Sequence, residues 1–154
     1  MQKKIIKLFI LSFILFIIGV FFISLNKNSI YDTKGLVGKK ILKFGLDHFS
    51  ENKMITAEDL NKNNFTLINF WASWCGPCRD EHSILLKLNE EKNLRLLGVN
   101  FKDKKNNAIK FLNELGNPFS IVLIDPEGII SISLGAYGVP ETYLLNNESK
   151  VIKK

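Results

Sequence analysis

The chain has 154 residues, of which 46% are hydrophobic and 23% charged, and its formal net charge is +6. This length is enough for one domain of ordinary size but not for two. Charges of both signs alternate along most of the chain, and no basic stripe is interleaved with aromatic residues. The composition therefore excludes an extended nucleic-acid-binding surface as the basis of function.

The N-terminal segment has the features of a membrane anchor. Residues 1–7 carry three lysines and no acidic residue, and residues 8–25 are apolar apart from Ser12, Gly19 and Ser24. A run of this length is near the lower limit for crossing a bilayer and exceeds the core of a usual signal peptide. Because no small-residue cleavage site follows, we expect an uncleaved anchor rather than a removed signal or a buried core helix. The lysines place the N-terminus in the cytoplasm and the rest of the chain outside it.

After the apolar run, residues 26–35 are polar and are expected to form a tether, and residues 36–154 are expected to form one compact domain. The pattern of this domain alternates between strand and helix and closes with a hairpin, which predicts an α/β fold with a mixed sheet flanked by helices. The expected elements are an edge strand 41–46, a short helix 57–60, strand 65–72, helix 79–89, strand 94–100, helix 106–115, strand 121–124, and hairpin strands 141–145 and 151–154.

The only two cysteines, Cys75 and Cys78, lie where the predicted strand 65–72 passes into the predicted helix 79–89. Thiols at a helix N-terminus are close to unpaired backbone N–H groups and to the positive end of the helix dipole, and both favour the thiolate. Because the thiolate is the nucleophile of disulfide exchange, we predict reversible dithiol–disulfide chemistry. We expect the sulfur of Cys75 to be exposed and to attack a partner's disulfide, and the more buried Cys78 to resolve the mixed disulfide.

Two other interpretations of the cysteine pair are a zinc site and a purely structural disulfide. Zinc needs four ligands, and only His48 and His82 are available beyond the cysteines. A structural disulfide that closes so short a loop removes little chain entropy. Redox chemistry is favoured over both, so we expect neither a metal nor a cofactor.

A second local signal lies at Val139-Pro140, directly before the first strand of the predicted hairpin. A cis peptide bond there would bring the main chain of Val139 beside the cysteines and leave it free for a bound peptide. Between the cysteines, Gly76 permits close approach of a substrate backbone and Pro77 suits the first helical turn. Together with Trp74, these residues form the expected substrate groove.

Five segments carry a resemblance to a known family. The stretch 71–82, Trp-Ala-Ser-Trp-Cys-Gly-Pro-Cys-Arg-Asp-Glu-His, resembles the thioredoxin superfamily. Residues 36–39 resemble the opening of a narrower group, residues 98–103 with 115–119 its central insertion, and residues 134–144 its cis-proline segment. This group is the DsbE/CcmG type, the membrane-tethered thiol:disulfide interchange proteins of cytochrome c maturation. The resemblance implies a thioredoxin-like fold.

The resemblance also implies a function. A protein of this type is a protein-disulfide oxidoreductase in the bacterial inner membrane, with its thioredoxin-like domain in the periplasm. It reduces the disulfide of apocytochrome c, or of its thiol-handling maturation partners, and is re-reduced by a membrane electron donor of the DsbD/CcdA type. The Gly76-Pro77 pair departs from the group's usual Pro-Thr or Val-Pro. It favours an alternative, a less specific TlpA/ResA-like thiol reductase for copper-site assembly or general disulfide reduction. A redox-silent scaffold that uses the same groove is a third hypothesis.

The resemblance assigns roles to further residues. It implies that the peptide bond before Pro140 is cis, and that Glu81 and Glu141 match acidic positions that the family keeps near its active site. A carboxylate there can take up or deliver the proton of Cys78 if burial raises its own pKa. The alternative for Glu81 is an exposed first-turn acid favoured by the helix dipole. Asn69 stands where ordinary thioredoxins carry a buried Asp. Relatives complete a strand and add a helix beyond the position of Lys154, and this C-terminal helix is missing here. Either the sequence is a fragment, or the fold ends early with an exposed apolar sheet face.

Overall fold

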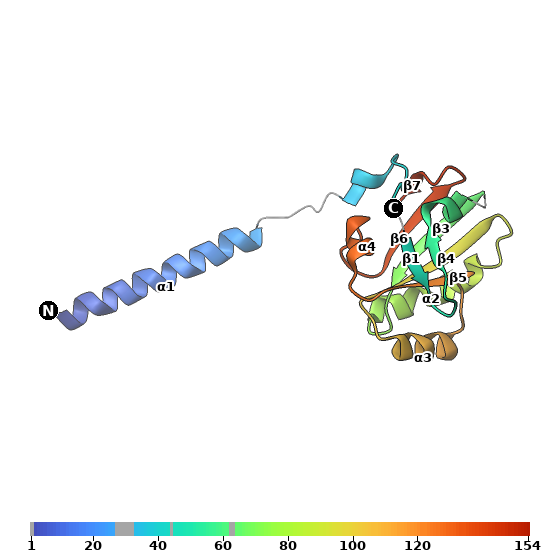
Figure 1. The fold of residues 1–154 in the computed structure, drawn as a ribbon. Coiled ribbons are helices and arrows are strands. Elements are labelled where there is room, and N and C mark those ends of the chain that lie inside the picture. The colour runs from blue at the N-terminus through green and yellow to red at the C-terminus, as the bar shows by residue number, and fades with distance from the viewer. Residues whose placement is uncertain (1, 27–32, 44, 62–63) are drawn as a thin grey trace. The chain divides into compact units, whose positions relative to one another are not determined.

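The computed structural model describes residues 2–26, 33–43, 45–61 and 64–154 (Figure 1). It separates into two compact units, Met1–Asp32 and Thr33–Lys154, and each is described by itself. The predicted tether, residues 26–35, falls mostly on residues 27–32, which lie outside the described residues.

The first unit contains one long helix, α1, which spans Gln2–Asn26. Its 25 residues give a length of roughly 37 Å at about 1.5 Å per residue, more than the roughly 30 Å of a bilayer's hydrocarbon core. Within it, Gln2–Leu25 is long and apolar enough to cross a membrane. Apolar side chains surround the helix on all sides and lie exposed in the structure, as suits contact with lipid rather than with a protein core.

The second unit is built on a mixed sheet whose strands follow the order β2-β1-β5-β4-β3-β6-β7. Strands β3, β4 and β5 are parallel to one another, and the other pairs are antiparallel. The mixed sheet predicted from the sequence is therefore confirmed. The strands are β1 Gly45–His48, β2 Met54–Thr56, β3 Phe65–Trp71, β4 Leu94–Phe101, β5 Ile121–Asp125, β6 Glu141–Asn146 and β7 Val151–Lys153.

Helices cover both faces of this sheet. Helix α2 follows β3 and helix α3 follows β4, so each provides the crossover that a parallel strand pair requires. Both helices pack on one face, and the short helix α4 contributes to the core of the other face. The helices of this unit are α2 Gly76–Leu88, α3 Lys105–Leu115 and α4 Ile129–Ser133, with 3₁₀ turns η1 Thr33–Leu36 and η2 Ala57–Asn61.

The alternation of side chains along β3 divides the core into two clusters, one on each sheet face. Phe70 points to the α4 side, where its ring meets Tyr143 edge to face with 5.1 Å between centroids. Trp71 points to the side of α2 and α3, where it lies 5.1 Å from the ring of Phe111 and 5.7 Å from that of Phe119. The second cluster also contains both cysteines, so the packing of α2 on the sheet fixes their position.

Two short elements differ from the sequence prediction. The predicted edge strand 41–46 is wrong, because β1 begins at Gly45 and lies between β5 and the true edge strand β2. The three residues of β2 are too few to show an alternating pattern, and the five of α4 too few to show a helical one. The helix predicted at 57–60 is the 3₁₀ turn η2 rather than an α-helix.

Part of the sheet face beside α2 is apolar and exposed. Phe65 is 42% exposed and Ile152 is 41% exposed. Between α2 and β6 lies a hollow of about 370 Å³, lined by residues that include Phe65, Leu88 and Leu144. Within the described residues, no helix follows β7.

Candidate active site

The two cysteines lie at the junction of β3 and α2, where the chain makes a turn from Ala72 to Cys75. The N–H of Cys75 donates to the carbonyl of Ala72 at 3.2 Å and closes this turn. Cys75 is the N-cap residue of α2, and its Sγ accepts a hydrogen bond from the N–H of Cys78 at 3.1 Å. The sulfur therefore occupies the place of a capping oxygen, next to the free N–H groups of the first turn.

Cys75 and Cys78 are joined by a disulfide bond. Cys78 is 2% exposed, as expected for the inner residue, but Cys75 is only 5% exposed. The prediction of an exposed Cys75 sulfur is therefore wrong for the disulfide form. The reason is tertiary packing, because Cys75 belongs to the buried apolar cluster of Trp71, and Val139 packs against the same cluster.

The proline segment lies at the same end of the sheet as the cysteines. The Val139–Pro140 peptide bond is cis, as the resemblance implied. Glu141, the first residue of β6, pairs with Phe70 near the end of β3, so the proline segment and the cysteine turn both border this edge. Of the predicted groove residues, Val139 and Pro140 are half-buried, whereas Gly76, Pro77 and Trp74 are exposed.

Asn69 and Glu81 form a polar link between β3 and α2. The side chain of Asn69 is fully buried, and its Nδ2 donates to Oε1 of Glu81 at 2.8 Å and to Oγ1 of Thr142 at 3.0 Å. Oδ1 of Asn69 has no hydrogen-bond partner within the described part of the chain. Glu81 is thus a half-buried, hydrogen-bonded carboxylate rather than an exposed first-turn acid.

Glu141, the second predicted acid, belongs to a different network. Its carboxylate forms an ion pair with Nζ of Lys154, which also donates to the carbonyl of Gly135 at 3.0 Å. The ammonium lies over the ring of Tyr143, 4.8 Å from the centroid. Burial raises the pKa of Tyr143, and the nearby charge of Glu141 adds to that effect. Both carboxylates line one hollow of about 740 Å³, but only Glu81 contacts Asn69.

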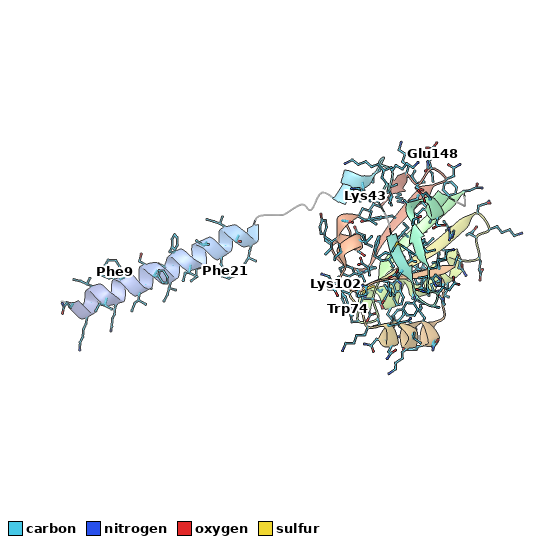
Figure 2. The ribbon with its side chains drawn as sticks, in the orientation of Figure 1. Phe9, Phe21, Lys43, Trp74, Lys102 and Glu148 are labelled. Atoms are coloured by element: carbon cyan, nitrogen blue, oxygen red, sulfur yellow. A yellow bond between two sulfur atoms is a disulfide. The ribbon has the colours of Figure 1, made fainter. Side chains whose placement is uncertain are left out.

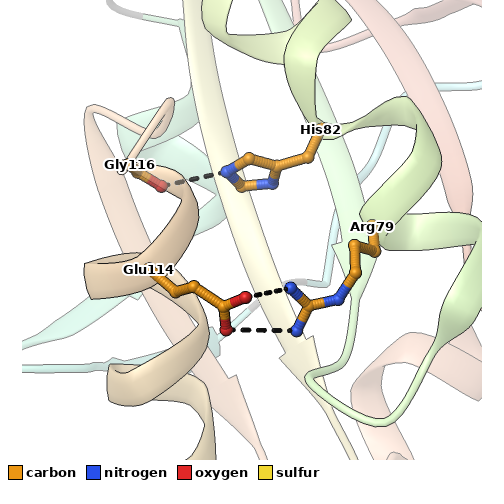
Figure 3. Close-up of polar contacts among 4 residues, drawn as sticks. All are labelled: Arg79, His82, Glu114 and Gly116. Atoms are coloured by element: carbon orange, nitrogen blue, oxygen red, sulfur yellow. Dashed lines mark hydrogen bonds and ion pairs between the residues drawn. The ribbon is translucent and has the colours of Figure 1, made fainter.

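His82, which the zinc interpretation would need, holds α2 against α3 instead (Figure 3). Its Nε2 lies 2.9 Å from the carbonyl oxygen of Gly116, and its ring meets the ring of Phe111 edge-on. One turn earlier, Arg79 pairs with Glu114 at 2.8 Å and its guanidinium lies over the same phenyl ring. These contacts cross from one helix to the other and hold α2 against α3.

The other histidine lies in a turn after β1, where Nδ1 of His48 accepts hydrogen bonds from the N–H groups of Ser50 and Glu51. Among the described residues, no cluster of three or more His, Cys, Asp or Glu side chains could hold a metal ion. The two cysteine sulfurs are bonded to each other.

The sequence did not predict that the loop between β4 and α3 borders the site. The indole Nε1 of Trp74 donates to the carbonyl of Lys102 at 3.0 Å, and these residues come from neighbouring loops (Figure 2). Asp103 accepts two hydrogen bonds from Ser73, one from its N–H and one from its hydroxyl. The strand–helix–strand pattern of the sequence could have indicated this position of the loop, because it predicts that β3 and β4 are parallel, and the carboxyl ends of neighbouring parallel strands lie at the same edge of a sheet.

The fold and the site together define a thioredoxin-like protein with a C-x-x-C disulfide at a helix N-terminus, beside a cis proline. Residues 36–154 match the Redoxin family, and the chain belongs to this family.

Three similar proteins carry related names. The chain is 45% identical over 93 residues to the thiol:disulfide interchange protein CycY of Rhizobium leguminosarum, covering 60% of this chain and 50% of that protein. It is 37% identical over 151 residues to the thiol:disulfide interchange protein DsbE of Vibrio cholerae, covering 95% and 81%. A crystal structure described as a putative DsbE from Chlorobium tepidum has a TM-score of 0.65 and 28% identity, covering 76% and 82%. The chain therefore spans about half of one curated relative and about four fifths of another.

Proposed function

We propose that this protein is a membrane-anchored thiol-disulfide oxidoreductase that works by exchange at Cys75 and Cys78. The observation that carries the proposal is the position of Cys75, whose Sγ caps α2 and accepts the N–H of Cys78 at 3.1 Å. The same N–H group and the helix dipole stabilise a thiolate on this sulfur after reduction. The relatives named thiol:disulfide interchange proteins support this activity.

The proposed reaction has two exchange steps. In the reduced protein, the Cys75 thiolate attacks one sulfur of a client disulfide, whose S–S bond breaks and whose second sulfur leaves as a thiolate. Cys78 then loses its proton and attacks Sγ of Cys75, which breaks the mixed disulfide and releases the client's first sulfur. The client gains two electrons, and its two thiolates take up the proton that Cys78 released and one proton from solvent. The protein ends as the Cys75–Cys78 disulfide.

We assign the proton of Cys78 to Glu81. The two residues are three positions apart on α2 and so share one helix face. The hydrogen bond of 2.8 Å from Nδ2 of buried Asn69 to Oε1 of Glu81 holds the carboxylate in place. Glu141, held by Lys154, is the secondary candidate. We expect Glu81→Gln to slow release of the mixed disulfide on the order of 100-fold, the lower range for loss of a general base. Glu141→Gln is the matched control, and equal slowing in both variants would contradict the assignment.

The proposed client is the disulfide of apocytochrome c or of a thiol-handling maturation partner. The resemblance to the DsbE/CcmG type and the DsbE and CycY names of the relatives support this choice. The client segment would lie along the groove of Trp74, Gly76, Pro77, Val139 and Pro140. Three of these residues are exposed and two are half-buried, so the groove offers a client segment accessible surface beside less exposed main chain.

The proposed location is the bacterial inner membrane, with one span. Residues 1–7 would lie in the cytoplasm, residues 8–25 would cross the membrane, and residues 26–35 would tether a periplasmic domain formed by residues 36–154. The basic N-terminus and the apolar helix support this orientation. Because the periplasm is kept oxidising, a reductant there needs a supply of electrons, for which we propose a membrane donor of the DsbD/CcdA type.

Deletion of the gene in its host tests the proposed client. We expect loss of all c-type cytochromes and rescue by added small thiols. The Gly76-Pro77 pair favours the second candidate function, a TlpA/ResA-like reductase for copper-site assembly or general disulfide reduction. That candidate predicts normal cytochrome c and failed copper-oxidase assembly. Full complementation by a Cys75→Ser, Cys78→Ser double variant would refute both and leave a redox-silent scaffold.

A further inference from the structure

The turn that presents Cys75 has little support of its own. Within the turn, its main-chain hydrogen bond is the 3.2 Å contact from the N–H of Cys75 to the carbonyl of Ala72. The two central residues, Ser73 and Trp74, are instead held by the loop that follows β4. The position of the attacking sulfur therefore depends on a segment about 30 residues further along the chain.

Asp103 is the centre of this support. Its Oδ2 accepts hydrogen bonds from the N–H of Ser73 at 2.6 Å and from Nδ2 of Asn100 at 3.0 Å. Its Oδ1 accepts from the hydroxyl of Ser73 at 2.9 Å and from the N–H of Lys104 at 2.7 Å. Hydrogen bonds to an ionised carboxylate are about twice as strong as neutral ones. The carboxylate thus joins the β3–α2 turn to the end of β4 and to Lys104, the N-cap residue of α3.

The loop that carries Asp103 is itself fixed. Lys102 has a φ of 46°, which is in the left-handed region that residues with a side chain adopt uncommonly. Its N–H donates to the carbonyl of Asp125 at 3.0 Å, which ties the residue to the end of β5. Its own carbonyl accepts from Nε1 of Trp74. Both the main chain and the carboxylate of this loop therefore face the residues before Cys75.

We propose that Asp103 is a positioning residue for the dithiol chemistry, which acts through Ser73 to hold Cys75 at the N-cap of α2. This inference rests on the proposed function, but it concerns the reactivity of the thiol rather than the client. A carboxylate that acted only as a nearby negative charge would disfavour the thiolate. A carboxylate that positions the sulfur at the helix N-terminus favours the thiolate, so the two roles have opposite effects on reactivity.

The experiment measures alkylation of Cys75 by iodoacetamide across pH, using the full chain in detergent micelles. Both the parent and the test protein carry Cys78→Ser, so that Cys75 is the single thiol and the backbone N–H at position 78 remains. Asp103→Asn keeps the shape of the side chain, but its amide N–H₂ would face N–H and O–H donors that now bond to a carboxylate oxygen. On the acid side of the titration, we expect alkylation to be slowed by about fivefold, because a smaller fraction of the Cys75 thiol is ionised.

Two further variants make the result decisive. Asp47→Asn removes a negative charge from an exposed side chain on β1, and it should leave the alkylation profile unchanged. Ser73→Ala removes one of the four hydrogen bonds of Asp103 and should slow alkylation by about twofold, which keeps the test available if Asp103→Asn does not fold. Faster alkylation in Asp103→Asn would show a purely electrostatic role. An unchanged profile with a lowered Tm would show a purely structural one, and either result overturns the proposal.

Discussion

Replacing Asn69 with Asp tests the polar link beneath the cysteine helix. In the structure, Nδ2 of Asn69 donates to Oε1 of Glu81 at 2.8 Å, and Asn69 is fully buried. Asn69→Asp puts an oxygen where the donor was, so that two carboxyl groups face each other at hydrogen-bond distance. Two such groups cannot both stay ionised, and the pair is expected to share one proton.

The magnitude follows from proton linkage. In the unfolded chain the two carboxyl groups titrate at ordinary pKa values of about 3.9 and 4.3. If the folded pair keeps its shared proton up to about pH 7, folding raises the pKa of that proton by roughly three units. Each unit corresponds to about 1.4 kcal/mol of unfolding free energy. Below pH 4, the shared proton should therefore leave the free energy of unfolding of the Asp variant unchanged. This free energy should fall by about 4 kcal/mol between pH 4 and pH 7, because the unfolded chain releases the proton that the folded chain keeps.

The assay is urea unfolding of the full chain in detergent micelles, followed by tryptophan fluorescence between pH 4 and pH 8. Asn69→Leu is the matched control, since it removes the same donors without adding a titrating group. Its loss of stability relative to the parent should change with pH far less than that of the Asp variant, because only one carboxyl group remains at the contact. If the two variants show the same dependence on pH, the contact between Asn69 and Glu81 is not as described.

Two further predictions concern the core. Burial raises the pKa of Tyr143, so its contribution to stability is present below pH ~10 and is lost as pH rises above that value. Tyr143→Phe should therefore flatten the alkaline fall in urea-unfolding stability, by up to about 1.4 kcal/mol per pH unit, whereas Tyr137→Phe should keep it. A Cβ added at Gly98 would meet the ring of Phe119 at 2.6 Å, so Gly98→Ala should cost about 1–3 kcal/mol by overpacking. Gly35→Ala, with nothing within 4 Å, is its control, and equal costs would contradict this packing.

The long periodic elements of the fold were predictable from the sequence. Strands β3 and β4 carry apolar runs of buried residues. Helix α3 ends at Leu115, before Gly116, whose φ of 88° is accessible to glycine. Helix α2 begins at Gly76 rather than at residue 79, because Cys75 supplies the N-cap with its sulfur. The short elements β2 and α4 depend on their neighbours in the fold rather than on local pattern, and the sequence does not reveal them.

The site was predictable to the extent that it is local. The cysteine pair and the cis proline lie in short motifs, and both were identified from the sequence. The contacts that position them join residues far apart, such as Ser73 with Asp103 and Asn69 with Thr142, and no local pattern encodes such a pairing. The burial of Cys75 was missed for the same reason, because the cluster around it is formed by packing between separate segments.

The central claim is that Cys75 is the sulfur that attacks a client, with Cys78 as the resolving partner. The most direct test is to express the full chain with Cys78→Ser in its host, quench with acid, and separate disulfide-linked species under non-reducing conditions. The account predicts mixed disulfides that form through Cys75, disappear on reduction, and are absent from the Cys75→Ser variant. Accumulation of the mixed disulfides in Cys75→Ser instead, or in neither variant, would contradict it.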